Sequence, residues 1–287
     1  MPVDSNGLSY AALPMLRDLV QERLGVFYDA GRIDMLADRL APLVLERGFE
    51  SYLDYYYLLK YDADAAAEWR RVLDALSVAE TYFWREIDQI RAVVNCVVPA
   101  LARRAPYSPI RIWSSPCATG EEPLTIAMLL EESGWFARVP IEIHASDGSA
   151  AAVERARRGR FRERAFRTLP ADMRERYFTR DGDLWAVDPS LHQRVRSWRV
   201  LNLMAEEDLG SMAGAPIVFC RNVFIYFAEA AVRRVVESLA RQMPWPSYLC
   251  VGASESLLKV TSLFELEEVG GAFVYAKRPE AGPELHV

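Results

Sequence analysis

Apolar residues recur at helical spacing through the first hundred residues of the chain. Leu13, Leu16 and Val20 lie three or four positions apart, and Gly25 follows this run. Such spacing places apolar side chains on one face of an amphipathic helix, which a glycine commonly ends. The same period predicts further helices at residues 34–47, 52–59, 65–76 and 88–103. Because no strand pattern precedes this point, we expect an all-α N-terminal domain with its linker helix over residues 1–103.

The pattern changes after residues 103–109, a segment rich in proline and arginine that is typical of a linker or surface turn. Short β-rich runs then alternate with helical runs. The expected strands are Ile110–Ser114, Ile141–Ala145, Ile217–Cys220, Tyr248–Gly252 and Phe273–Lys277, and the expected helices are Leu124–Glu132, Ala150–Arg158 and Glu229–Gln242. This alternation predicts an α/β domain over residues 104–287 with a doubly wound, Rossmann-like, mostly parallel sheet.

One segment of this second domain does not alternate between strand and helix. Gly182–Val187 and Gln193–Val200 have the character of two strands joined at Asp188-Pro189-Ser190. This pattern predicts a hairpin, and therefore a small antiparallel β insertion at about residues 180–200.

Composition and charge exclude several classes of protein. Hydrophobic residues make up 51% of the chain and charged residues 26%, which is enough apolar surface for a folded core. The net charge of −6 makes nucleic-acid binding by the whole surface improbable, and charge-free stretches are too short for direct membrane insertion. The four cysteines are scattered without a CxxC pair, and the three histidines lie far apart in the sequence. They indicate a reduced, cytoplasmic chain without a metal site or disulfide framework.

The segment IRIWSSPCATGEEPLTIAMLL joins a buried strand to a helix through a turn of small residues. Small residues let a ligand approach the backbone closely. Glu121 and Glu122 stand at the helix start, where a phosphate would otherwise bind. They therefore favour a ligand with ammonium, sulfonium or hydroxyl groups. The alternative is that the two carboxylates only complement the helix dipole.

Two further segments place polar residues after expected strands. Asp147, in IEIHASDG, is suited to accept hydrogen bonds from both hydroxyls of a ribose, or alternatively to cap the following helix. Arg221 and Asn222, in PIVFCRNVFIYF, follow an apolar strand and are suited to a cleft floor, the alternative being a surface turn. Strand C-termini share one edge of a parallel sheet, so we expect these residues to lie together.

The fourth segment is TYFWRE. Thr81 and Arg85 stand four positions apart, so they share a face if this segment is helical. The aromatic residues between them are alternatively core residues. No histidine lies near the TYFWR, GEEP or CRNVFIYF segments.

These segments, in this order, resemble the motifs of the CheR family, S-adenosylmethionine-dependent methyltransferases that esterify glutamates on chemotaxis-type receptors. TYFWR is similar to the family's T-x-F-F-R, WSSPCATGEEP resembles W-S-A-x-C-S-T-G-E-E-P-Y, and CRNVFIYF is nearly identical to C-R-N-V-x-I-Y-F. VGASES resembles G-x-S-E. The resemblance covers about residues 10–278 and implies a Rossmann-like methyltransferase fold. The chain departs from the family pattern at Ala79, Leu124 and Gly148.

The resemblance implies a role for each matching residue. The implied cofactor-binding residues are Thr81 and Arg85 at the methionine end, one of the pair Glu121 and Glu122, Asp147 at the ribose, and Asn202, Leu203, Arg221 and Asn222 around the adenine and methionyl parts. Tyr226 is expected to face the methyl group, so Arg85 and Tyr226 are the expected catalytic residues. The implied products are a glutamate methyl ester and S-adenosylhomocysteine.

Methyl transfer from a sulfonium to an ionised glutamate requires no general base, because the pKa of a free glutamate is about 4.3. The implied partner is the cytoplasmic helical region of a methyl-accepting receptor. Arg32 and Arg39, together with ten arginines within residues 155–180, are expected to bind an acidic helix, although a merely solvated arginine face is equally compatible. Two alternatives stay open: a non-catalytic S-adenosylmethionine-binding regulator, and a small-molecule carboxyl methyltransferase on the same fold.

Overall fold

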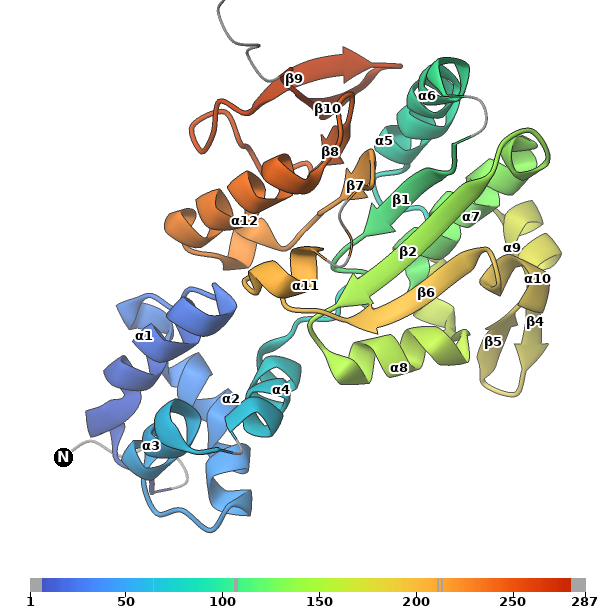
Figure 1. Cartoon of the computed structure of the whole chain (residues 1–287). Coiled ribbons are helices and arrows are strands. Elements are labelled where there is room, and N and C mark those ends of the chain that lie inside the picture. The colour runs from blue at the N-terminus through green and yellow to red at the C-terminus, as the bar shows by residue number, and fades with distance from the viewer. Residues whose placement is uncertain (1–6, 64, 106–107, 211, 213, 280–287) are drawn as a thin grey trace, which may run out of the picture.

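The computed structural model describes residues 7–279 except residues 64, 106–107, 211 and 213, so part of the expected 103–109 linker lies outside the described residues. A group of helices precedes a sheet that has helices on both faces (Figure 1). The helices that precede the sheet are η1 (Tyr10–Ala12), α1 (Leu13–Leu24), η2 (Ala30–Arg32), α2 (Ile33–Glu46), α3 (Tyr52–Tyr61), α4 (Ala65–Leu76), α5 (Ile87–Ala92), the π-helical η3 (Val93–Val97) and α6 (Val98–Arg104). The helices expected before the sheet are thus confirmed, to within a few residues at their ends.

Local signals explain where these helices begin and end. Gly25 ends α1 in the left-handed conformation (φ 77°), and the Ser51 hydroxyl accepts a hydrogen bond from the backbone N–H of Asp54 at the start of α3. The apolar faces of α1 to α4 meet in one core that includes Leu16, Leu40 and Trp69. The helices α5 and α6 instead pack into the core beneath the sheet.

The main sheet has seven strands in the order β6-β2-β1-β7-β8-β10-β9. Its strands are β1 (Ile110–Ser114), β2 (Ile141–Asp147), β6 (Val195–Val200), β7 (Ile217–Phe219), β8 (Tyr248–Cys250), β9 (Phe264–Val269) and β10 (Ala272–Lys277). The first five in spatial order are parallel, and β10 is antiparallel to both of its neighbours. The doubly wound, Rossmann-like prediction is therefore confirmed, with β9 as a strand that the pattern did not predict.

Helices cover both faces of this sheet. They are α7 (Glu121–Glu132), η4 (Trp135–Ala137), α8 (Ala150–Arg158), α11 (Glu206–Gly210), η6 (Phe224–Tyr226) and α12 (Glu229–Gln242). Successive residues of one strand enter different cores: Ile112 packs with α7, whereas Trp113 packs with α12. The strand order reverses between β1 and β7, and ligands of such sheets bind at the carboxyl ends of the strands beside this reversal.

The small antiparallel sheet is present, but the expected hairpin is wrong. The sheet consists of β3 (Arg160–Arg162), β5 (Leu184–Val187) and β4 (Phe178–Asp181), with η5 (Glu163–Phe166) and α9 (Ala171–Tyr177) between β3 and β4. Asp188 makes no hairpin turn. Its carboxylate accepts hydrogen bonds from the N–H groups of Ser190 and Leu191 and starts a short helix, α10 (Pro189–His192). The chain therefore leaves the small sheet, and β6 joins the main sheet parallel to β2.

The insertion thus occupies residues 160–187 instead of about 180–200. Within the described part of the chain, no helix is long and apolar enough to cross a membrane.

Candidate active site

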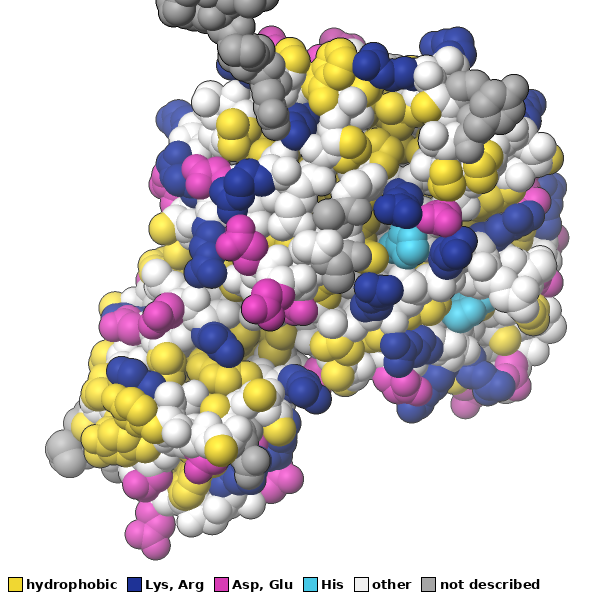
Figure 2. All heavy atoms as spheres, in the orientation of Figure 1, with side chains coloured by type: hydrophobic (Ala, Val, Ile, Leu, Met, Phe, Trp, Pro, Cys, Tyr) yellow, Lys and Arg dark blue, Asp and Glu magenta, His cyan; other side chains and the backbone are white. Residues whose placement is uncertain are grey.

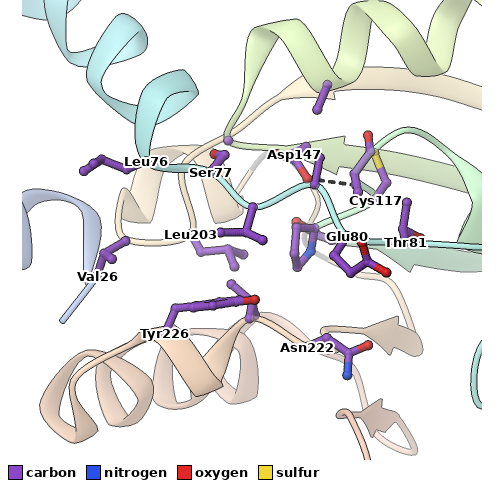
Figure 3. A pocket seen from close by; sticks show the side chains of 18 of the residues that line it. Val26, Leu76, Ser77, Glu80, Thr81, Cys117, Asp147, Leu203, Asn222 and Tyr226 are labelled. Carbon is purple, nitrogen blue, oxygen red and sulfur yellow. Dashed lines mark hydrogen bonds between the residues drawn. The ribbon is translucent and has the colours of Figure 1, made fainter. Parts of the chain in front are cut away.

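A pocket of about 230 Å³ lies between the N-terminal helices and the carboxyl ends of β1, β2 and β7 (Figure 3). Its lining comes from segments far apart in the sequence, within residues 24–39, 73–90, 115–125, 147–152, 201–203 and 221–227. The pocket is therefore at the edge where the parallel strands and the reversal of strand order predict a ligand.

The structure brings all but one of the expected site residues to this pocket. Those that line it are Arg32, Arg39, Thr81, Arg85, Glu122, Asp147, Asn202, Leu203, Arg221, Asn222 and Tyr226. Glu121 is outside the lining: its buried carboxylate accepts a hydrogen bond from the Thr119 hydroxyl at 2.7 Å. Burial raises the pKa of Glu121 to about 7. Of the adjacent glutamates, only Glu122 therefore lines the pocket.

Asp147 ties the second strand to the turn after the first. Its Oδ2 accepts the N–H of Ala118 at 2.8 Å, and its Oδ1 accepts the N–H of Ser149 at 2.8 Å. The hydroxyl that caps α8 belongs to Ser149, which accepts the N–H of Ala152. Asp147 is therefore not the helix cap. Burial raises the pKa of the Asp147 carboxyl, and the two N–H groups oppose that rise.

Helix α4 packs directly on the corner of the pocket formed by Asp147 and Gly148. A Cβ on Gly148 would lie 2.7 Å from Leu73 Cδ2, so the glycine permits a close approach that a larger residue would prevent. Asp74 Oδ1 accepts hydrogen bonds from the Ser149 hydroxyl at 2.6 Å and the Ala151 N–H at 3.1 Å. These contacts explain the departure from the family pattern at Gly148 and place the chain after α4 along the pocket.

The TYFWRE segment is not helical. Trp84 and Glu86 have positive φ angles of 69° and 47°, so the backbone turns there. Phe83 is fully buried in a cluster of aromatic rings from the small sheet and its neighbours, Phe161, Phe166 and Phe178. Phe83 and Trp84 of this motif are thus core residues, while the half-buried Tyr82 lines the pocket together with Thr81 and Arg85.

Arg221 joins three motifs at the base of the pocket. Its side chain is 1% exposed, and its Nη2 donates to the carbonyl of Arg85 at 2.8 Å. Its Nε lies 3.3 Å from Glu122 Oε2, and its Nη2 lies 3.5 Å from Glu86 Oε2. Burial raises the pKa of Glu122, and the Arg221 charge opposes that rise. The interpretation of residues 221–222 as a surface turn is therefore wrong.

Two further carboxylates, for which the motifs predicted no role, hold the backbone and side chains of the same region by hydrogen bonds. Glu255 accepts N–H groups of Gly252 at 2.6 Å, Phe224 at 2.7 Å and Asn222 at 2.8 Å. Glu86 accepts the side-chain amide of Asn222 at 3.1 Å and the N–H of Ala253 at 3.0 Å. Glu86 lies in the motif TYFWRE, and Glu255 lies in VGASES. Their positions within these motifs are the sequence signal by which a role could have been predicted.

Main-chain hydrogen bonds connect the N-terminal helices to the opposite wall. The N–H of Phe27 donates to the carbonyl of Tyr226 at 2.8 Å, and the N–H of Ala228 donates to the carbonyl of Gly25 at 3.0 Å. The Asn202 amide also donates to the carbonyl of Arg23 at 3.1 Å. In Figure 3, Asp147 and Tyr226 lie on opposite sides of the pocket with Leu203 between them.

Two family models cover most of the chain. The CheR methyltransferase all-alpha domain matches residues 11–77, and the CheR methyltransferase SAM binding domain matches residues 79–272. The chain belongs to the CheR methyltransferase family. It is an S-adenosylmethionine-dependent methyltransferase, and the CheR resemblance of its motifs is confirmed.

Curated relatives of this CheR-family chain include chemotaxis protein methyltransferase 2 of Vibrio cholerae, 33% identical over 264 residues that cover 91% of each protein. The chemotaxis protein methyltransferase of Borreliella burgdorferi is 30% identical over 85% of this chain and 88% of that protein. Among solved structures, the magnesium protoporphyrin IX methyltransferase of Synechocystis with bound SAM aligns with 78% of this chain and 94% of its own at a TM-score of 0.35 and 14% identity.

The pocket of this CheR-family chain fits S-adenosylmethionine chemically. Asp147 provides a buried carboxylate, Glu122 provides a second one, and Leu203 and Val223 provide apolar surface for a flat ring. The turn at residues 115–118 brings the backbone against the pocket without large side chains. These groups suit hydroxyls, a cation and an aromatic base in one ligand.

Proposed function

We propose that this protein transfers the methyl group of S-adenosylmethionine to glutamate side-chain carboxylates in the cytoplasmic helical region of a methyl-accepting chemotaxis receptor. It is then a cytoplasmic protein-glutamate O-methyltransferase that yields glutamate methyl esters and S-adenosylhomocysteine. The observation that carries this proposal is the shared pocket. It is lined by the carboxylates of Asp147, in β2, and Glu122, in α7, and by two arginines of the N-terminal helices, the exposed Arg32 and the half-buried Arg39. The names of the V. cholerae and B. burgdorferi relatives support a role in chemotaxis.

In this proposal the cofactor binds along the sheet edge. Asp147 accepts hydrogen bonds from the ribose hydroxyls, and its own bonds to the N–H groups of Ala118 and Ser149 hold its two oxygens in place. The remaining cofactor-binding residues are Thr81, Arg85 and Glu122 at the methionyl part, and Asn202, Leu203, Arg221 and Asn222 along the rest. Glu121 has no direct contact in this arrangement, because it does not line the pocket.

S-adenosylmethionine, when bound, supplies a methyl group on a positively charged sulfur. The incoming glutamate is already ionised at neutral pH, so the protein has no proton to remove. Arg85 and Tyr226 are the proposed catalytic residues: Arg85 orients the carboxylate, and Tyr226 borders the methyl position. In-line positioning of this kind accounts for up to about 7–11 kcal/mol in intramolecular analogues. Charge is neutralised as the bond forms, so exclusion of water assists the reaction.

We assign substrate capture to Arg32 and Arg39, which line the same pocket but differ in exposure. The Arg32 side chain is 61% exposed and lies 3.4 Å from Asp29. Arg39 is half-buried, and its Nη1 donates to the carbonyl of Ala75 at 3.0 Å. Arg39 therefore also holds the chain segment after α4, whereas the exposed Arg32 can exchange its weak surface pair with Asp29 for a carboxylate of the substrate.

The arginine-rich surface supports substrate steering less than its charge count implies. Figure 2 shows Lys and Arg side chains interspersed with Asp and Glu over the side of the molecule formed by β6 and α8. Within residues 155–180, ion pairs join Arg158 to Glu154, Arg160 to Asp181, Arg167 to Glu80, Arg174 to Glu163 and Arg176 to Glu132. Pairing neutralises much of this face, so the pocket mouth is the better-supported substrate surface.

The test is a methylation assay with the full chain, methyl-labelled S-adenosylmethionine and purified cytoplasmic fragments of the chemotaxis receptors of the same cell. We expect label in a receptor fragment, released as methanol by mild base, because methyl esters are base-labile. A fragment in which the labelled glutamate is replaced by glutamine is the matched control and should take up no label.

Absence of label from every receptor fragment, with S-adenosylhomocysteine still bound, would favour the non-catalytic regulator. Label transferred instead to small carboxylic acids would favour the small-molecule enzyme.

A further inference from the structure

Exposed apolar side chains gather around the mouth of the pocket. Phe27 is 46% exposed, Met35 51%, Val78 46%, Ile225 49% and Tyr226 37%. Four of them line the pocket, and the fifth, Ile225, is adjacent to Tyr226 in the chain. We call these five residues the apolar collar. Single exposed hydrophobic residues are ordinary, but several around one opening mark an interaction surface.

Rigid elements present the collar. The N–H of Phe27 donates to the carbonyl of Tyr226, so residues from distant parts of the sequence are locked side by side. Glu255 accepts the N–H of Ile225 at 3.3 Å and thereby holds the turn that carries it. Met35 lies in the first turn of α2, next to the fully buried Leu36. The collar side chains are therefore exposed although the backbone that carries them is held in place by hydrogen bonds and helix packing.

Charge at the same opening indicates what covers the collar. Arg32 lies between Phe27 and Met35 in the sequence, lines the same pocket and is 61% exposed. An opening that combines apolar side chains with an available guanidinium is complementary to an amphipathic helix with acidic and apolar positions. Residues three or four apart on such a helix are about 5–6 Å from each other, so one opening can contact both kinds.

We propose that the apolar collar docks apolar side chains of the substrate helix that lie within one turn of the glutamate to be methylated. This inference rests on the proposed function, and it names the substrate side chains that the protein recognises in addition to the glutamate carboxylate. Covering the collar also closes the pocket to water at the moment when a carboxylate and a sulfonium must meet without it. Specificity then comes from apolar neighbours of the target glutamate, and acidic neighbours engage Arg32.

The experiment compares two collar variants with two matched controls in the receptor methylation assay. Met35→Gln and Val78→Gln remove apolar surface from the collar at residues that line the pocket. Met15→Gln, in α1, and Leu258→Gln make similar changes at residues that are 43% and 65% exposed and lie outside the pocket lining. We expect each collar variant to lower kcat/KM for the receptor fragment about tenfold, mainly through KM. The controls should stay within about twofold of the wild type.

The receptor side provides a second measurement. Serine in place of the apolar residues within one helical turn of the methylated glutamate should lower kcat/KM similarly, and should add little to Met35→Gln. Such non-additivity is expected only if the two groups contact each other.

The possible failures are distinguishable. If the wild type methylates no receptor fragment, the proposed function fails and the collar inference fails with it. If the wild type methylates a fragment normally and both collar variants match their controls, the collar inference alone is overturned. Concentration-dependent dimerisation that Met35→Gln abolishes, with kcat/KM unchanged, would overturn it in favour of a second copy of this chain.

Discussion

Asp147 and Arg221 at the floor of the pocket are buried and hydrogen-bonded, whereas Arg32, Phe27 and Met35 at its mouth are exposed. Each floor residue is held by backbone groups or by a partner of opposite charge from another motif. At the mouth, Arg32 lies 3.4 Å from the carboxylate of Asp29, which is itself exposed. The floor is thus arranged before any ligand arrives, whereas the mouth has apolar and charged groups that a partner can cover.

The difference has an energetic consequence. Buried charges are costly unless they are paired and hydrogen-bonded, so a change at the floor leaves other groups unsatisfied and should affect folding as well as binding. Exposed charges at the mouth are screened by water and salt, so changes there should affect substrate capture alone. The following predictions test this contrast, from the largest expected effect to the smallest.

Arg221→Met should destabilise the protein by about 3–5 kcal/mol, because it leaves the carboxylates of Glu86 and Glu122 without their buried partner. Urea unfolding at neutral pH measures this loss. The control is Arg241→Met, which removes a surface ion pair 2.9 Å from Glu206 and should cost less than about 1 kcal/mol. Equal losses in the two variants would contradict the expectation that a buried charge pair at the floor costs more to disrupt than an exposed pair at the surface.

The buried carboxyl group of Glu121 should make the free energy of unfolding of the protein depend on pH. Its folded pKa of about 7 lies above the ordinary value of 4.5, because burial disfavours its charged form. Such a group contributes stability fully below the unfolded pKa and loses it as pH rises through the folded pKa. Between pH 4.5 and 8 the loss is on the order of 3 kcal/mol, at 1.36 kcal/mol per pKa unit.

Glu121→Gln should therefore become more stable relative to the wild type as pH rises across this range. Chemical unfolding of both proteins at several pH values provides the measurement. Parallel stability curves for the two proteins would contradict the assignment of a buried, costly carboxylate beneath the floor.

Asp147→Asn should weaken binding of S-adenosylhomocysteine about 10- to 100-fold, because it removes charge-assisted hydrogen bonds to the ribose. Calorimetry measures this affinity, and a melting curve without ligand shows whether the variant is folded. A folded variant with unchanged affinity would exclude the ribose role of Asp147.

Arg85→Ala and Tyr226→Phe should each lower kcat about tenfold, the loss expected for one oriented contact in the transition state. Both should melt close to the wild type. The Arg85 side chain is 26% exposed and donates to the carbonyl of Glu80, and the Tyr226 side chain is exposed. Steady-state methylation of the receptor fragment gives kcat. Full activity in either variant would refute its catalytic role, and a large fall in stability would place that residue with the floor.

Arg32→Glu should have the smallest effect, a several-fold loss of kcat/KM for the receptor at low salt. Added salt should reduce the difference, because the Debye length falls to about 8 Å at physiological ionic strength. Arg70→Glu is the matched control: it makes the same charge change at an exposed position of α4 outside the pocket lining. If Arg70→Glu matches Arg32→Glu, the effect is one of overall charge and not of the mouth.

Much of the fold follows from local pattern. The helices α1, α4 and α12 lie where apolar residues recur at helical spacing, and β1 and β2 lie where short apolar runs follow turns. The domain boundary at residue 103 stays a prediction. The hairpin prediction failed because the strand pattern of residues 193–200 does not say which strand they pair with, and β2 provided the partner.

The sequence by itself determined the helices, the alternation of the sheet and the motifs that meet at the pocket, because these depend on spacing within short segments. Only the tertiary structure decided which glutamates face the pocket, and that Glu255 and Glu86 hold its floor, because their partners are distant in the sequence. It also buried Glu68 completely among Arg47, Arg71 and Tyr55 in the helical core. Burial and pairing of a charge depend on what the rest of the chain places around it, which no local pattern contains.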